Sequence, residues 1–370
     1  MSKISSNDYT KQFFKSNKDH HYNLEKSADE YIVSSGSMIL DSYLGGGFGS
    51  GVHRFTGANE GGKTNEALAV MLNMLKTVDK SKGLYIKAEG RLSKDVQKRS
   101  GLKFVYDPEQ WVAGTCLIFE CNIFDVIFDY LRGLLRNNPE SEKFCIVIDS
   151  MDGLLPKAEV DKSTGEAAKV AGGALMTSDF LKRVSLGMSK FGHMCIMISQ
   201  IRANINVNPY AKGDPNNQTN SSGGNAALHY PDWILEFQKQ NKSDKILEKP
   251  NQQITPDNKV YGHMAKVLIC KSVNETTGQT VKYPIKHGRT DGKSIWIERE
   301  IVEMLLMWGY LEKSGAWFSV DKDVKDFLAS KDIEIKDKFQ GMASIYEYLE
   351  QDEATTEALK HFIKTNVLEK

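Results

Sequence analysis

The chain has 370 residues, and its 48 lysine and arginine residues balance 48 aspartate and glutamate residues. This length allows two domains and a substantial core. The zero net charge excludes a strong overall attraction to polyanions, so any contact with nucleic acid must come from local basic patches. The five cysteines form no CxxC pair, and three lie in apolar, strand-like runs, where we expect them to be small buried side chains. This cysteine usage predicts a reducing compartment for the protein.

No apolar stretch near the start is typical of a signal peptide, and no segment approaches the roughly 18 apolar residues of a membrane span. The eight histidines show no HExxH or other regular metal-ligand spacing, so we expect ordinary surface or core side chains. These features predict a soluble, cytoplasmic protein that has no contact with a membrane.

Residues 1–33 are polar and predict an arm that is partly separate from the body. Short β-rich runs then alternate with longer helical patterns, which predicts an α/β fold with a largely parallel, doubly wound sheet in residues 34–286. After residue 287 the pattern predicts a small, mainly helical domain, residues 287–370. The predicted strands are 52–57, 83–89, 144–150, 194–200, 232–238 and 265–271, and the predicted helices of the core are 63–78, 122–135 and 174–191.

The segment "GANEGGKT", Gly57 to Thr64, fits the phosphate-loop pattern GxxxxGK[ST] and lies between a predicted strand and a predicted helix. Glycines let the backbone N–H groups face an anion, and the helix N-terminus adds favourable charge. We expect Lys63 to reach the outer phosphates of ATP and Thr64 to hold Mg²⁺. The alternative, a glycine-rich turn that contains Lys-Thr by chance, is disfavoured by the flanking strand and helix.

Two acidic residues end predicted strands, where open α/β sheets bind ligands. Asp149 is the predicted second anchor for Mg²⁺, and Glu89 is the predicted group that orients or deprotonates water. Taken alone, Asp149 fits a helix cap or turn equally well and Glu89 fits a solvated side chain. The predicted nucleotide-binding residues are Gly57, Ala58, Asn59, Glu60, Gly61, Gly62, Lys63, Thr64, Asn65 and Asp149.

Several further motifs occur in an order that resembles the RecA family of recombinases, among them "VIDSMDGLLPKAEV", "ISQIR" and "SGGNAALHY". The resemblance extends along most of the chain and implies a RecA-like P-loop NTPase core. It implies that Glu89 is the catalytic glutamate and that Asp149 is the Walker B aspartate. It also implies that Gln200 senses the γ-phosphate of ATP.

The same resemblance implies two DNA-binding loops, residues 156–173 and 200–225, and explains why so long a polar run lacks a strand pattern. Without the resemblance, the second loop would fit a disordered surface loop, and Lys182 and Arg183 would fit a solvated helix face. The predicted DNA-binding residues are Ser178, Lys182, Arg183, Arg202, Lys212, Gly223, Gly224 and Asn225.

Members of this family form helical filaments with ATP between subunits, and Lys271 matches a lysine that reaches the neighbour's phosphates. A second such lysine is replaced by Val273, so either Lys282 substitutes or the ATPase is weaker. Val96 stands where the family often has an adenine-stacking tyrosine, and His229 stands at an interface aromatic position. In the poorly matching arm, the adjacent Phe13 and Phe14 are candidates for subunit docking.

The resemblance therefore predicts a DNA-dependent ATPase that hydrolyses ATP to ADP and phosphate with Mg²⁺, forms filaments on single-stranded DNA, and exchanges strands with a homologous duplex in recombination and repair. Single-strand-binding and loader proteins are candidate partners. The divergent arm and interface suit a phage-encoded member that acts in the cytoplasm of a bacterial cell or an infected host. The alternatives are a ring-forming motor or regulatory ATPase of the same fold, and a DNA-coating protein with a weakened ATPase.

Overall fold

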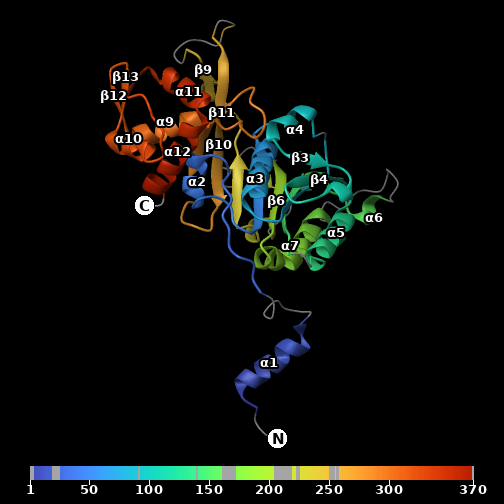
Figure 1. Cartoon of the computed structure of the whole chain (residues 1–370). Helices are drawn as coiled ribbons and strands as arrows, with labels where there is room; N and C mark the ends of the chain where they lie inside the picture. The colour runs from blue at the N-terminus through green and yellow to red at the C-terminus, as the bar shows by residue number, and fades with distance from the viewer. Residues whose placement is uncertain are drawn as a thin grey trace, which may run out of the picture.

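The computed structural model describes an α/β core with a smaller mixed unit beside it (Figure 1). This confirms the predicted α/β class with a large, mostly parallel sheet. The described residues are 4–18, 26–90, 92–138, 141–160, 172–203, 219–221, 226–249, 255 and 258–368, with the backbone alone described at 172–175, 202–203 and 219–221.

Within the described residues the main sheet has eleven strands, and seven of them, from β8 to the edge strand β3, run parallel. These strands are apolar almost throughout because helices cover both faces of the sheet. In spatial order they are β8 (Trp233–Phe237), β1 (Gly51–Gly57), β6 (Met194–Ala203), β5 (Lys143–Asp149), β2 (Ser81–Lys87), β4 (Thr115–Glu120) and β3 (Lys103–Val105).

Antiparallel strands extend one side of this sheet. The long β10 pairs with β8 and β11, the short β9 pairs with β10, and β7 pairs with the end of β6. All six strands expected from the sequence are present, whereas the others were not predicted. The antiparallel strands are β7 (Thr219–Ser221), β9 (Lys245–Leu247), β10 (Val260–Lys271) and β11 (Thr280–Lys286).

Successive strand residues face opposite cores, as a pleated strand requires. On β5, Val147 packs in the core beneath α2, α3 and α4, and Ile146 and Ile148 pack in the core beneath α5 and α7. Figure 1 shows α3 on one face of the sheet and the α5 and α7 pair on the other. The core helices are α2 (Met38–Leu44), α3 (Lys63–Thr77), α4 (Lys94–Ser100), α5 (Phe124–Arg136), α6 (Lys157–Val160), α7 (Gly172–Lys190) and α8 (Ala226–His229).

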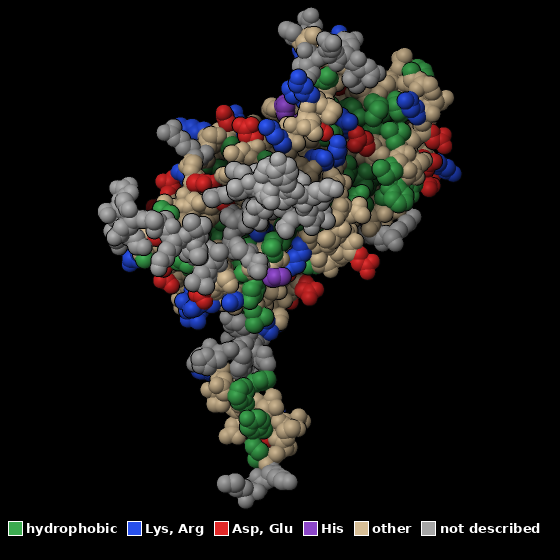
Figure 2. Space-filling model, turned by 180° about the vertical axis from the view of Figure 1, so that it is seen from behind, with side chains coloured by type: hydrophobic (Ala, Val, Ile, Leu, Met, Phe, Trp, Pro, Cys, Tyr) green, Lys and Arg blue, Asp and Glu red, His purple; other side chains and the backbone are tan. Residues whose placement is uncertain are grey.

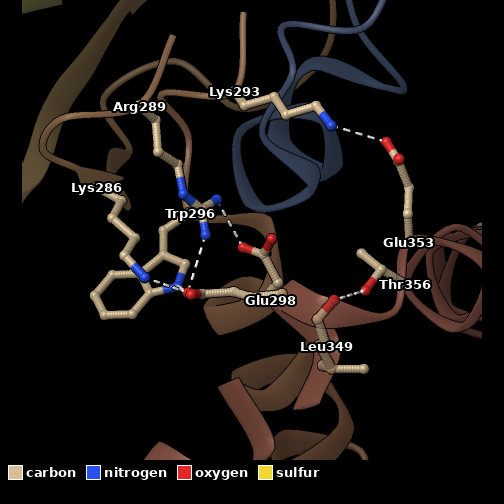
Figure 3. A network of polar contacts seen from close by, with 9 residues as sticks. Lys286, Arg289, Lys293, Trp296, Glu298, Leu349, Glu353 and Thr356 are labelled. Atoms are coloured by element: carbon tan, nitrogen blue, oxygen red, sulfur yellow. Dashed lines mark hydrogen bonds and ion pairs between the residues drawn. The ribbon is translucent and has the colours of Figure 1, made fainter. Parts of the chain in front are cut away.

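The last part of the chain has a hydrophobic core of its own, to which Met38 of α2 also contributes. A charged network joins it to the segment that follows β11, since Arg289 contacts Glu298 at 2.8 Å and Glu350 at 2.9 Å (Figure 3). The proposed domain limits at residues 33 and 286 stay predictions. The elements here are α9 (Ile297–Met307), β12 (Leu311–Ser314), β13 (Trp317–Val320), α10 (Lys322–Ala329), β14 (Lys338–Gln340), α11 (Met342–Gln351) and α12 (Glu353–Ile363).

The first helix, α1 (Ser6–Ser16), contains no buried residue and projects away from the body in Figure 1. The Ser5 side chain accepts the Asp8 amide and caps this helix. The following segment returns to the core, where the Ala28 amide donates to the Lys190 carbonyl group. On the face seen in Figure 2, acidic and basic side chains are intermixed, in keeping with the balanced composition.

The cysteine expectations are only partly correct. Cys145 and Cys195 are buried in β5 and β6, whereas Cys270 is exposed at the end of β10, where its thiol lies 3.8 Å from a carboxylate oxygen of Glu236. Cys116 is also buried, on the unpredicted strand β4. Within the described ranges, no helix is long and apolar enough to cross a membrane.

Candidate nucleotide and DNA-binding site

The predicted phosphate loop connects β1 to α3 at the carboxyl edge of the parallel strands. Gly57 has φ 140°, and a Cβ atom there would lie 2.1 Å from the Phe237 carbonyl oxygen, so only glycine fits between β1 and β8. Gly62 precedes the first residue of α3 in a left-handed conformation, with φ 102°. The loop therefore ends at the N-terminus of a 15-residue helix, which suits an anion.

Lys63 is the first residue of α3, and its side chain is only 8% exposed. Its Nζ donates to the carbonyl oxygens of Gly57 at 3.0 Å and Ala58 at 2.7 Å, which holds the ammonium group at the loop itself. Burial lowers the pKa of Lys63, whereas the acidic side chains nearby, led by Asp149, oppose this shift. The site thus combines a buried cation with backbone amides, as a polyphosphate site requires.

Asp149 ends β5 and joins two elements of the site. Its Oδ2 accepts hydrogen bonds from Thr64 Oγ1 and from the Tyr85 hydroxyl, both at 2.7 Å. Because Thr64 donates its proton to Asp149, its oxygen keeps lone pairs for a cation. Hydroxyl and carboxylate oxygens beside a phosphate loop fit Mg²⁺, which prefers few protein ligands together with water and phosphate oxygens. Burial raises the pKa of Tyr85, so its hydroxyl stays a donor.

Glu89 lies two residues beyond the end of β2, and its side chain is held by donors that follow β5 and lie on β6. Ser150 Oγ and Gln200 Nε2 both donate to Glu89 Oε1, the second at 3.2 Å. The Gln200 amide N–H donates to Asp152 Oδ2 at 2.6 Å, which fixes the backbone at this end of the described site. The structure therefore brings the predicted hydrolytic carboxylate and the predicted phosphate sensor into direct contact.

Arg54 is a component that the sequence did not reveal. It lies in the middle of β1, is 1% exposed, and donates from Nε to Ser199 Oγ at 3.0 Å and from Nη1 to the Ala227 carbonyl oxygen at 3.1 Å. Burial lowers the pKa of Arg54 to about 10, and the charge of Asp152 opposes this shift. Arg54 thus connects the strand before the phosphate loop to residues on both sides of segment 200–225.

The predicted intersubunit residues lie on the side of β10. Lys271 Nζ donates to the carbonyl oxygens of His229 at 2.5 Å and Pro231 at 2.6 Å, so within one chain it binds the segment around α8. Val273 is 66% exposed. Lys282, the suggested substitute cation, contacts Asp244 at 3.1 Å.

Val96 and His229 differ in their surroundings. Val96 lies on α4 and packs against the core that also contains α3, whereas His229 is exposed at the end of α8. In the arm, Phe13 is exposed and Phe14 is half-buried.

The DNA-binding predictions fall partly outside the described residues. Ser178, Lys182 and Arg183 lie on α7, where Lys182 and Arg183 are exposed and Arg183 contacts Asp179 at 2.9 Å. The backbone of Arg202 lies in β6, opposite residue 220 of β7. The remaining predictions, which lie outside the described residues, are Lys212, Gly223, Gly224, Asn225 and positions 161–171 of the first loop.

Comparison with known proteins gives consistent matches. A model of the RecA N-terminal domain matches residues 134–279. Protein RecA of Bordetella avium is 27% identical over 361 residues, which cover 96% of this chain and 88% of that protein. Protein RecA of Nitrobacter winogradskyi is 28% identical over 80% of this chain and 73% of its own length, and that of Mesoplasma florum is 28% identical over 82% and 80%.

Proposed function

The chain belongs to the RecA family, and from this premise we propose that it is an ATP-dependent recombinase. In this proposal it forms helical filaments on single-stranded DNA, captures a homologous duplex and exchanges strands in recombination and repair. ATP binding favours the active filament, and hydrolysis to ADP and phosphate favours release. Base pairing tests homology, so the protein needs only to hold the DNA backbones.

The observation that carries this proposal is the hydrogen bond between Gln200 and Glu89. A γ-phosphate oxygen is a competing acceptor for the Gln200 amide group. When Gln200 turns to that oxygen, Glu89 becomes available to orient or deprotonate the attacking water. Since Gln200 also begins segment 200–225, occupancy of the phosphate site and the state of the loop become linked.

The rest of the pocket supplies binding and charge. Lys63 binds the outer phosphates. Its hydrogen bonds to the loop carbonyl groups are weaker than hydrogen bonds to a phosphate anion, so ATP can replace them. Thr64 and Asp149 would hold Mg²⁺, and the ion would supply positive charge beside the phosphates. Glycine amides of the loop bind further phosphate oxygens.

The DNA surface in this proposal consists of α7 and the two segments that flank it, with Lys182 and Arg183 as exposed cations. Contacts of lysine, arginine and backbone amides with phosphates position DNA without reading its sequence. Affinity for single-stranded DNA should therefore fall steeply and linearly on a log–log plot against salt concentration, because bound counterions are released. A flat dependence would exclude a phosphate-binding surface.

The filament requires a second copy of the chain, with Lys271 reaching the neighbour's phosphates and the arm as a docking segment. Action in the cytoplasm, with single-strand-binding and loader proteins, is part of the same proposal. Electron microscopy with single-stranded DNA and ATP tests the assembly. Open helical filaments are expected, and closed rings would favour a motor of the same fold.

The central test is ATP hydrolysis with and without single-stranded DNA, followed by a homologous pairing assay. We expect turnover to rise several-fold with DNA and joint molecules to form only with homologous duplex. An equal rate of ATP hydrolysis with and without DNA would contradict the proposed link at Gln200. DNA binding without any hydrolysis would favour a coating protein instead.

A further inference from the structure

The Tyr85 hydroxyl is a polar group that packing of the core does not require. Tyr85 lies on β2, is 3% exposed, and its ring packs in the core beneath α3. A phenylalanine ring would fill the same space. A buried hydroxyl is tolerated only when it is hydrogen-bonded, and this one donates to Asp149 Oδ2 at 2.7 Å.

Strand register places this hydroxyl at Asp149. In the parallel pair of β2 and β5, Tyr85 lies opposite Val147 and Lys87 lies opposite Asp149. The Tyr85 side chain therefore extends along the sheet toward the carboxyl edge, where Thr64 of the neighbouring helix approaches the same carboxylate. Three separate elements, β2, β5 and α3, thus meet at one oxygen atom.

The two hydrogen bonds to Asp149 Oδ2 fix the rotation of the carboxylate. Both the Thr64 and Tyr85 hydroxyls donate to Oδ2, and among the described residues none donates to Oδ1. With one oxygen held by two donors, the other keeps a fixed direction. Because the Thr64 hydroxyl directs its proton to Asp149, the lone pairs of Thr64 Oγ1 stay available to a cation.

We propose that Tyr85 is a positioning residue that sets Asp149 and Thr64 for Mg²⁺, and this inference rests on the proposed ATP-binding function. Groups that orient metal ligands through hydrogen bonds typically change metal affinity by a factor of 10 to 100 when they are removed. Loss of the Tyr85 hydroxyl should therefore raise the Mg²⁺ concentration needed for half-maximal nucleotide binding by about tenfold. Nucleotide binding in EDTA, which depends on Lys63 and the loop amides, should stay unchanged.

Tyr283 provides a matched control. It lies in the same core cluster, is 2% exposed, and its hydroxyl also donates to a carboxylate, Glu66 Oε2 on α3, at 2.8 Å. Tyr85→Phe and Tyr283→Phe therefore remove equivalent buried hydroxyls from the same core. Only Tyr85 contacts the predicted magnesium site.

The experiment measures binding of a fluorescent ATP analogue across a Mg²⁺ titration and in EDTA, for the full chain and both variants, with thermal melting as a check on folding. The expected result is a shift of the Mg²⁺ midpoint in Tyr85→Phe alone. Equal midpoints in the two variants, or equal weakening of binding in EDTA, would overturn the assignment of Tyr85. A wild-type chain that binds no nucleotide under any condition would overturn the proposed function and this assignment together.

Discussion

The Gln200 side-chain amide lies 3.2 Å from Glu89 Oε1, although 111 residues separate the two in the sequence. Glu89 follows β2 and Gln200 lies on β6, with β5 between these strands. The contact therefore spans the carboxyl edge of three strands and ends at the first residue of the proposed second DNA-binding loop. In the proposed function, this contact is the link through which nucleotide and DNA influence each other.

Gln200→Ala should uncouple ATP hydrolysis from DNA. The variant keeps the amide N–H that binds Asp152 but loses the group that contacts Glu89. We expect the several-fold stimulation by single-stranded DNA to disappear while nucleotide binding persists. Steady-state hydrolysis with and without DNA measures the effect. Gln97→Ala removes another partly buried glutamine, on α4, that donates to the Leu92 carbonyl oxygen, and it should retain stimulation. Equal stimulation in both variants would argue against the link.

Lys63→Ala should abolish turnover, because it removes the buried cation at the phosphate loop. Loss of a group that stabilises charge in the transition state typically costs about 100-fold or more in rate. The measurement is ATP hydrolysis at saturating ATP together with the nucleotide dissociation constant. Lys76→Ala is the control, since Lys76 is exposed at the far end of the same helix. Unimpaired hydrolysis by Lys63→Ala would disprove the assignment of the pocket.

The sequence predicted the parts of this site that arise from local patterns. The phosphate loop was recognisable because its glycines, Lys63 and Thr64 are contiguous, and Asp149 was recognisable because it ends an apolar strand. Tyr85 and Arg54 were not, since each lies inside a predicted strand and its contacts depend on partners 64 and 145 residues away. No periodicity encodes such a contact.

The fold shows the same limit. Strands buried on both faces, such as β5 and β6, were predicted from continuous apolar runs. The edge strand β11 was missed because lysines alternate with its apolar residues and Pro284 interrupts it, a pattern that suits a strand only beside a partner such as β10. Cys270 was expected to be buried from its apolar neighbours, but it lies where β10 reaches the surface.

Arg54→Met should destabilise the chain and reveal the coupling of Arg54 to Asp152. Arg54→Met removes two buried hydrogen bonds, and Asp152→Asn removes an opposing charge from the surroundings of the buried Arg54. Leaving a buried charge uncompensated typically costs about 3 to 5 kcal/mol in the free energy of unfolding. Urea denaturation of Arg54→Met, Asp152→Asn and the double variant measures this. We expect the double variant to be less destabilised than the sum of the single variants, because the Asp152 charge opposes the cost of burying Arg54 only while Arg54 is present. Strict additivity would show that the two charges act independently.

Glu300 should make stability depend on pH at the junction of α2 and α9. Its carboxylate is buried, accepts hydrogen bonds from Ser37 Oγ at 2.5 Å and from the Met38 amide at 2.8 Å, and has a pKa raised to about 8 by burial, despite these bonds. Burial also raises the pKa of the neighbouring Asp41 to about 6.

A folded-state pKa above the unfolded value means that the folded chain binds the proton more tightly. The contribution of Glu300 to stability is therefore full below pH 4.5, the ordinary pKa of glutamate, and is lost as the pH rises toward 8. The slope is at most about 1.4 kcal/mol per pH unit for one proton. Glu300→Gln keeps an amide that can pair with Ser37 and Met38 but cannot ionise, so its free energy of unfolding should change less between pH 5 and 8. Urea denaturation at each pH measures both chains, and identical pH profiles would show that Glu300 is already ionised in the folded state.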